Sequence, residues 1–273
     1  MRKVTFMGID GSGKTTLMLA LKKAIGEAAS FLHSPDFHEI PGFAGAEESR
    51  ALTEFSRLAD AYADPGLKLT SLYLRMCLFG EAEAHLASTE RRNTLCIERH
   101  ALIDSLTYLP VYIAAMKRSG LRAGDSAFVM LQIGNRHPVV FQAVHAALAR
   151  RDRRLGIDSP TVGSVAEYCM GFGDLSASDF VESLARDYQT GLPDSLLYLD
   201  IPPEVAFERI CARGKPLEAH ETLENLTRLD KLARSRFSDF EALGVRCQTL
   251  PVTKLPESEL IAIVSGHVLA PTA

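Results

Sequence analysis

The feature that most constrains this chain is the run Gly8-Ile9-Asp10-Gly11-Ser12-Gly13-Lys14-Thr15, which fits the pattern G-x-x-x-x-G-K-[ST]. It follows a short apolar segment, Val4 to Gly8, that is typical of a buried parallel strand, and it precedes a helical pattern that Gly26 ends. Between a strand and a helix, such glycines let backbone N–H groups surround phosphate oxygens at the positive end of the helix. The run therefore predicts a nucleoside triphosphate site.

The same run assigns chemical roles by position. Lys14 is expected to reach the β and γ phosphate oxygens of ATP, and the Thr15 hydroxyl is expected to hold Mg²⁺. No N-K-x-D guanine-reading motif occurs, and Asp200 is followed by Ile201 rather than by a second acid, which favours a kinase over a switch GTPase or a motor ATPase. The predicted ATP-binding residues are Gly8, Ile9, Asp10, Gly11, Ser12, Gly13, Lys14, Thr15 and Thr16.

Strand patterns alternate with helical patterns along much of the chain. Further short apolar strands are predicted at 31–33, 94–97, 195–200 and 245–250, and the last two are followed by helical patterns at 203–212 and 257–269. Such alternation indicates βαβ units and a parallel sheet, hence an α/β fold. Helical patterns are also predicted at 47–63 and 68–88, and the pattern between Arg99 and Pro193 is almost wholly helical. We expect one sheet-centred domain with a helical excursion.

Three segments resemble one kinase family. The loop Phe6 to Thr16 resembles the phosphate loop of thymidylate kinases, and Ile97-Glu98-Arg99-His100 is similar to their Asp-Arg-Tyr/His element and to the Glu-Arg-Ser element of deoxynucleoside kinases. The segment 192–206, with Glu208-Arg209 and Ala212-Arg213-Gly214, is similar to the strand and helix that lead into the thymidylate kinase lid. The resemblance implies a three-layer α/β/α P-loop kinase fold with a parallel sheet and a lid at about 209–222. The residue pattern adds an enlarged helical excursion, a helical insertion at about 101–190 that is longer than in an ordinary thymidylate kinase, within a single domain over 1–273.

The resemblance also implies roles for side chains outside the loop. Arg99 would bind the phosphate of the acceptor or position its reacting oxygen, Glu98 would sit near Mg²⁺ and the acceptor, and Asp10 would reach the acceptor sugar. Because no arginine lies inside the phosphate loop, arginines of the lid would neutralise the transferring group. Arg209 and Arg213 are four residues apart, so a helix would place both guanidinium groups on one face. The alternative for Arg209 is an ordinary ion pair on a solvated helix.

Two weaker signals lie in the helical patterns. By the resemblance, Arg75 would hydrogen-bond the acceptor base and Phe79 would stack on it, both from the helix predicted at 68–88. The alternative is an apolar core stripe with one solvated arginine. The basic run 150–154 is interpreted as a solvated helix end.

These signals together predict a kinase that uses ATP and Mg²⁺ to phosphorylate a nucleoside monophosphate. A thymidylate-like acceptor is the leading choice. The Arg-Glu-Pro-Gly-Gly segment that thymidylate kinases carry after the second strand is not recognisable in residues 33–39. A kinase of nucleosides or other small molecules with an altered acceptor pocket therefore remains an alternative. A nucleotide-operated regulatory ATPase is the alternative from a different class.

The composition indicates which classes of partner and which cellular compartment to expect. Thirty Lys and Arg residues stand against 34 Asp and Glu, a net charge of −4, which leaves no basic surplus for a nucleic acid. The five cysteines form no C-x-x-C pair, which argues against a zinc site or a disulfide framework. No apolar run approaches the length of a membrane span. We expect a cytoplasmic protein with a small-molecule acceptor and with no nucleic-acid or membrane partner. A homodimer is compatible with these signals.

Overall fold

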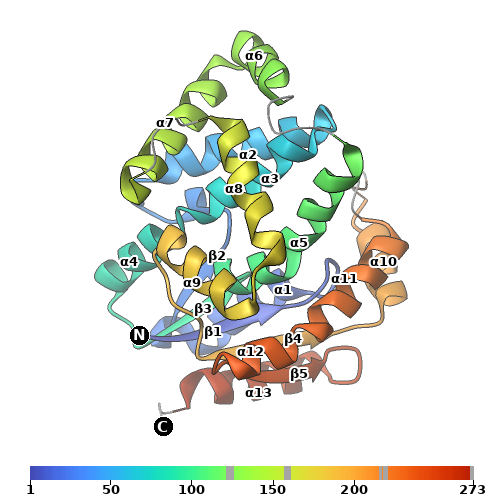
Figure 1. Cartoon of the computed structure of the whole chain (residues 1–273). Coiled ribbons are helices and arrows are strands. Elements are labelled where there is room, and N and C mark those ends of the chain that lie inside the picture. Colours follow the sequence, from blue (N-terminus) through green and yellow to red (C-terminus); the bar gives the residue numbers. More distant parts are fainter. Residues whose placement is uncertain (121–125, 157–160, 215–216, 218–220, 271–273) are drawn as a thin grey trace. The chain divides into compact units, whose positions relative to one another are not determined.

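The computed structural model contains a five-stranded, all-parallel sheet in the strand order β2, β3, β1, β4, β5 (Figure 1). The structure describes residues 1–120, 126–156, 161–214, 217 and 221–270. Every strand lies within two residues of the range that the sequence predicts, so the predicted α/β class with a parallel sheet is confirmed. The strands are β1 (Arg2–Met7), β2 (Ser30–His33), β3 (Thr94–Glu98), β4 (Ser195–Asp200) and β5 (Arg246–Pro251).

The chain divides into two compact units. The sheet unit comprises Met1–His33, Leu86–Ile103 and Leu192–Ala273, and the helical unit comprises Ser34–His85 and Asp104–Gly191. Along the chain, helices α4 (Phe79–Glu90) and α5 (Ala101–Ser119) pass from one unit to the other. The interpretation of residues 1–273 as a single domain stays a prediction.

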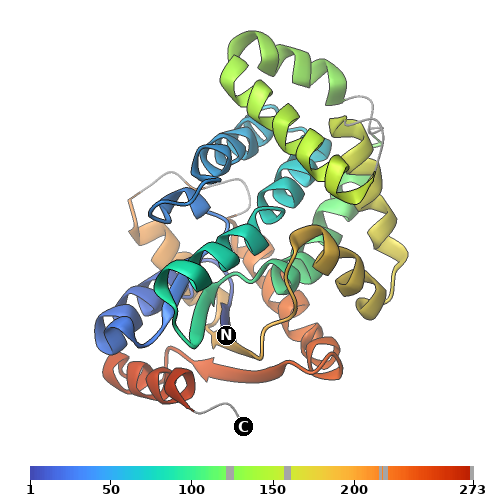
Figure 2. The same ribbon diagram turned by 90° about the vertical axis from the view of Figure 1, so that its left-hand side faces the viewer.

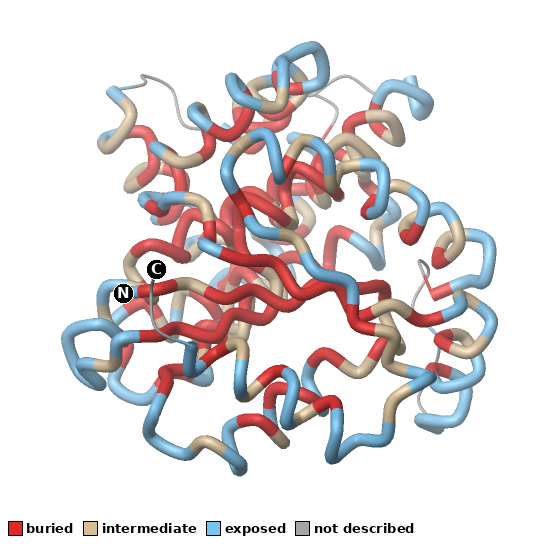
Figure 3. The backbone as a smooth tube through the Cα atoms, turned by 90° about the horizontal axis from the view of Figure 1, so that it is seen from below, coloured by how far each residue is buried: buried red, intermediate tan, exposed pale blue. Residues whose placement is uncertain are grey.

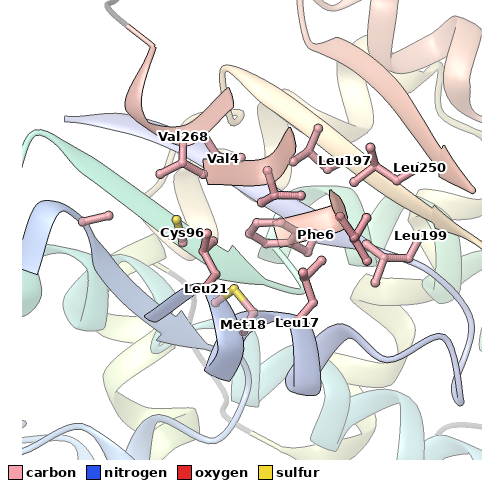
Figure 4. Close-up of a cluster of buried hydrophobic side chains, with 13 residues drawn as sticks. Val4, Phe6, Leu17, Met18, Leu21, Cys96, Leu197, Leu199, Leu250 and Val268 are labelled. Carbon is pink, nitrogen blue, oxygen red and sulfur yellow. The ribbon is translucent and has the colours of Figure 1, made fainter. Parts of the chain in front are cut away.

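One face of the sheet packs on helices α1 (Lys14–Ile25) and α13 (Glu257–Leu269), which lie side by side (Figure 2). Parallel strands are covered on both faces and so carry nearly continuous apolar runs. Strand β3, which lies between β2 and β1, is buried along its whole length. Figure 3 shows the backbone coloured by burial, with buried stretches in red. The core on this face contains Val4, Phe6, Leu17, Met18, Leu21, Ala29, Cys96, Leu197, Leu199, Leu250, Leu260, Val264 and Val268 (Figure 4).

The opposite face is covered near β4 by α11 (Leu223–Ser235) and α12 (Phe237–Ala242). Tyr198 alternates with the core residues of β4, and its hydroxyl donates a hydrogen bond to Asp230 of α11 (2.5 Å). Its ring also packs edge-to-face on Phe237 of α12. Helices on both faces confirm the predicted α/β/α layering, and α10 (Pro203–Ala212) follows β4 as the sequence predicts.

The helical unit is built wholly from helices and turns in its described residues, as the pattern between Arg99 and Pro193 predicts. Most of α5 also belongs to it. None of the helices in the described part of the chain is long and apolar enough to cross a membrane. The other helices of this unit are α2 (Ala46–Ala61), α3 (Pro65–Met76), α6 (Ser126–Arg136), α7 (Pro138–Leu155), α8 (Val162–Gly171) and α9 (Ala177–Tyr188).

The single helix predicted over 68–88 is wrong in one respect, because it is interrupted at Cys77 and Leu78. Helix α3 ends at Met76, and α4 begins at Phe79. Just after the break, a Cβ on Gly80 would lie 2.4 Å from the carbonyl oxygen of Gln189, so the backbones approach here at a distance that only glycine permits. Arg75 and Phe79 therefore stand on different helices.

The basic run 150–154 is also not the solvated helix end that the sequence predicts. The side chain of Arg151 is only 2% exposed, and its guanidinium lies over the rings of Tyr73 and Tyr168. Arg151 Nε donates to the Tyr73 hydroxyl (3.1 Å), which in turn donates to the buried carboxylate of Asp187 (2.7 Å). The run thus contributes a buried polar network to the helical unit.

Candidate active site

The phosphate-loop sequence lies between β1 and α1, in the strand–loop–helix context that the motif requires. Gly11 and Gly13 have φ angles of 81° and 90°, in the left-handed region that glycine adopts without strain. A Cβ on Gly11 would also lie 2.4 Å from the backbone oxygen of Ala206, so this loop must keep a glycine there to pack on α10. Helix α1 begins at Lys14, and its N-terminus opens onto the loop.

Lys14 folds back over the loop from the first turn of α1. Its Nζ donates hydrogen bonds to the carbonyl oxygens of Gly8 (2.8 Å) and Ile9 (3.0 Å), and it lies 3.8 Å from Asp10 Oδ1. The hydroxyl of Ser12 is buried and has no hydrogen-bond partner among the described residues. A buried ammonium group, an orphaned hydroxyl and a helix N-terminus together form a site that suits phosphate oxygens.

The next residue, Thr15, contacts the end of β3. Its Oγ1 donates a hydrogen bond to Glu98 Oε1 (2.9 Å), and the other carboxylate oxygen, Oε2, lies 3.0 Å from His33 Nδ1. Burial raises the pKa of Glu98, but the hydrogen bonds from His33 and Thr15 and the charges of Lys14 and Arg99 outweigh burial. The net pKa lies below the ordinary value of 4.5, so this carboxylate is anionic at neutral pH.

The Thr15 and Glu98 pair fits a magnesium site. Mg²⁺ prefers oxygen ligands and is usually held by one or two protein groups together with waters and substrate phosphates. A hydroxyl and a carboxylate beside the phosphate loop satisfy that requirement. Within the described ranges no group of three or more His, Cys, Asp or Glu side chains could hold a metal by itself. A cation held by these two groups would therefore take its remaining ligands from waters and bound phosphate.

Arg99 follows β3 directly and adopts a left-handed backbone conformation with φ of 61°, which is uncommon for a residue other than glycine. Its Nη2 donates a hydrogen bond to Asp10 Oδ1 (2.5 Å), and its side chain is 30% exposed. The structure thus brings a second cation to the phosphate loop, and it pairs Asp10 with that cation. The predicted contact of Asp10 with an acceptor sugar stays a prediction.

The two arginines predicted for the lid, one on α10 and one directly after it, differ in their surroundings. Arg209 is exposed, and its Nη1 lies 4.0 Å from the position that a Cβ on Gly13 would take, so its guanidinium is beside the phosphate loop. Arg213 follows the last helical residue, and its Nη2 donates to the buried carboxylate of Glu221. Residues 215, 216 and 218–220 of the predicted lid lie outside the described residues. Of the two side chains, Arg209 is the one next to the loop.

Arg75 and Phe79 belong to the helical unit, and their predicted acceptor contacts stay predictions. Arg75 is 13% exposed and pairs with Asp36 (3.2 Å), whose side chain is 47% exposed. Phe79 is fully buried and packs edge-to-face on Phe37, with ring centroids 6.1 Å apart. The ring of Phe79 thus serves the core of this unit.

Two contacts at the site were not anticipated from the sequence. The sequence predicts His33 at the end of the second strand and indicates no role for it. In the structure it hydrogen-bonds Glu98, because the two residues are direct partners in the β2–β3 register. Glu221 is the buried partner of Arg213 and lies eight residues away, across the lid segment. Knowledge of the strand order would have identified His33, whereas no local sequence signal identifies Glu221.

No family model and no curated protein matches the sequence. Among solved structures, the chain is similar to deoxyadenosine kinase from M. mycoides with bound dATP, at 13% identity and a TM-score of 0.47, over 98% of this chain and 100% of that one. It is similar to the same enzyme with the products dCMP and a flexible dCDP, at 14% identity and a TM-score of 0.45, over 97% of both chains.

Proposed function

We propose that this chain is a kinase that transfers the γ-phosphoryl group of ATP, with Mg²⁺, to a nucleoside monophosphate or a nucleoside. A thymidylate-like monophosphate is the first acceptor to test. One observation carries the proposal: the buried ammonium of Lys14, the Thr15–Glu98 oxygen pair and the Arg99 guanidinium meet at the N-terminus of α1. A site built for phosphates, a divalent cation and extra negative charge suits phosphoryl transfer.

The proposed reaction asks the protein chiefly for positioning and charge neutralisation. The loop N–H groups and Lys14 would hold the β and γ phosphates. The Lys14 ammonium would then donate to phosphate oxygens instead of to the carbonyl oxygens of Gly8 and Ile9. Thr15 and Glu98 would hold Mg²⁺, which when bound neutralises charge on the phosphate oxygens. Arg209, beside Gly13, would face charge that develops on the transferring group.

Arg99 supports an acceptor that carries a phosphate. The negative charge of a triphosphate bound to the loop would already be neutralised by Lys14, Arg209 and the helix N-terminus. The further guanidinium of Arg99 at the end of β3 is therefore suited to a phosphate carried by the acceptor. A nucleoside acceptor presents a neutral hydroxyl instead and gains less from that charge. The monophosphate therefore ranks before the nucleoside.

A nucleotide-operated ATPase would use the same loop and differs in its product. Purified protein should be incubated with γ-labelled ATP, Mg²⁺ and a panel of nucleosides and nucleoside monophosphates, and the labelled products separated. We expect label to pass to an acceptor in the unaltered protein and in Lys23→Ala, whose exposed lysine lies further along α1. Lys14→Ala should abolish transfer. Phosphate release without a labelled acceptor would indicate the ATPase, and no ATP turnover at all would refute the proposed function.

A further inference from the structure

Asp10 is the one acidic side chain inside the phosphate loop. Its Oδ1 accepts a hydrogen bond from Arg99 Nη2 at 2.5 Å and lies 3.8 Å from Lys14 Nζ. Hydrogen bonds between ionised partners are shorter and stronger than those between neutral groups. The carboxylate is thus already engaged with the two cations that the proposed reaction uses.

The backbones at both ends of this ion pair are tightly constrained. Asp10 is held in the loop between Ile9 and Gly11, and Gly11 packs against the backbone of α10. Arg99 holds a left-handed φ of 61° immediately after β3, and its N–H contacts the carbonyl of Phe6 (3.4 Å). A strained backbone of this kind persists only where surrounding contacts determine it. The pair therefore links the loop after β1 to the end of β3 with little freedom at either end.

From this geometry we propose that Asp10 is a positioning residue that holds the Arg99 guanidinium at the phosphate loop, and that it acts through Arg99 rather than by contacting the acceptor. The inference rests on the proposed function and deepens it. A guanidinium already oriented when substrate arrives needs no reorganisation in the transition state. Loss of Asp10 should consequently slow the chemical step more than it weakens binding of ATP.

A double-mutant cycle with Asp10→Ala and Arg99→Ala tests this coupling. We expect Asp10→Ala alone to lower kcat by tenfold or more while ATP affinity changes less than threefold. In the Arg99→Ala background, the same substitution should change kcat by less than about twofold, because its route of action is gone. Asp10→Glu should recover part of the rate. Losses that multiply in the double variant would overturn the inference, as would a loss confined to ATP affinity, which would place the action of Asp10 on Lys14.

Acceptors that lack one sugar hydroxyl separate positioning from direct contact. A positioning role predicts that Asp10→Ala lowers kcat by the same factor with thymidine monophosphate and with its 3′-deoxy analogue. A loss seen only with the hydroxyl-bearing acceptor would overturn the inference in favour of direct contact.

A readout without turnover distinguishes failure of this inference from failure of the proposed function. Relaxation of the ¹⁵N-labelled Arg99 Nε–H group should report an ordered side chain in the unaltered protein and a mobile one in Asp10→Ala. Replacing the exposed Asp194, whose carboxylate accepts from Lys3 N, is a matched acidic control that should leave Arg99 ordered. An Arg99 side chain that is equally ordered in the presence and absence of the Asp10 carboxylate would refute the inference, whether or not the protein transfers phosphate.

Discussion

Replacing Asp187 with alanine should destabilise the protein strongly, and the structure indicates by how much. The Asp187 side chain is fully buried, and its Oδ2 accepts hydrogen bonds from the hydroxyls of Tyr73 (2.7 Å) and Tyr168 (2.8 Å). Burial, with the nearby Asp187 carboxylate, raises the pKa of both tyrosines, so both stay protonated as donors. Hydrogen bonds to a charged group contribute about 1.5–3 kcal/mol each.

The loss does not end with those two bonds. The alanine variant would leave the buried Tyr73 hydroxyl and the half-buried Tyr168 hydroxyl without their acceptor. It would also remove a negative charge near Arg151, whose guanidinium keeps Asp152 as a partner (2.6 Å). Removing one member of a buried charged network costs about 3–5 kcal/mol. For a chain of this size, each kcal/mol lowers Tm by about 2–4 °C, so the expected fall is on the order of 10 °C.

Thermal unfolding followed by circular dichroism measures this effect. Arg186→Ala is the matched control, because Arg186 is the preceding residue of the same helix, is 70% exposed, and lies 3.8 Å from Asp187 Oδ1. Exposed ion pairs contribute about 0–1 kcal/mol, so its Tm should fall by no more than about 4 °C. Asp187→Asn keeps an acceptor oxygen and should lie between the two. If Asp187→Ala unfolds within about 2 °C of the unaltered protein, the reasoning about this network is refuted.

Three further predictions concern the sheet unit. Gly11→Ala should weaken binding of a fluorescent ATP analogue by tenfold or more, because the new Cβ would lie 2.4 Å from the Ala206 backbone oxygen. The alanine would also have to adopt a left-handed backbone conformation, which costs about 1–2 kcal/mol. Unchanged affinity would contradict this prediction. In single-turnover assays Arg209→Ala should lower the rate more than Arg213→Ala does, because only Arg209 lies beside Gly13; equal losses would argue against that placement. The lowered pKa of Glu98 means that its ionised form stabilises the fold above about pH 4.5, and that this contribution is lost as pH falls through the lowered value. The difference in unfolding free energy between the unaltered protein and Glu98→Gln should therefore shrink on acidification, and a difference that is constant from pH 6 to about pH 3 would oppose this assignment.

The phosphate loop and the strands could be predicted because their signals are local. The loop is a contiguous run whose glycines, lysine and threonine have fixed positions, and each strand is a short apolar run bounded by polar or turn residues. The contact of His33 with Glu98 could not be predicted in the same way. It depends on β2 and β3 being neighbours in a particular register, and strand order is a long-range property that no local pattern states.

The charged residues of the helical unit were harder to interpret. Arg151 stands in a run of four arginines and one aspartate, a composition that usually marks a solvated helix end. Its tertiary partners Tyr73 and Tyr168 explain its burial. The break between α3 and α4 lies next to a long-range contact, the close approach of the Gly80 and Gln189 backbones, which helical periodicity does not register. The burial of Arg151 and the contact at Gly80 both depend on tertiary neighbours that no local pattern states.

The strand order explains why the site draws on distant parts of the sequence. Strand β1 lies between β3 and β4, so the loop that follows β1 is flanked by the carboxyl ends of both neighbours. The end of β3 supplies Glu98 and Arg99, and the helix after β4 supplies Arg209. Carboxyl ends of parallel strands are where such sheets bind ligands.

The same strand order places the helical unit and the phosphate loop in different connections of the chain. Both segments of the helical unit, 34–85 and 104–191, are inserted after β2 and β3, whereas the phosphate loop and α10 follow β1 and β4. Insertions after β2 and β3 can therefore change in length and sequence without altering the connections that build the phosphate site. If the proposed kinase function is correct, substitutions in the helical unit should change which acceptor is used, and substitutions in the loop should affect all acceptors alike. Arg75→Ala and Lys14→Ala, compared across one acceptor panel, distinguish these effects, and an equal loss for every acceptor in both variants would contradict this division.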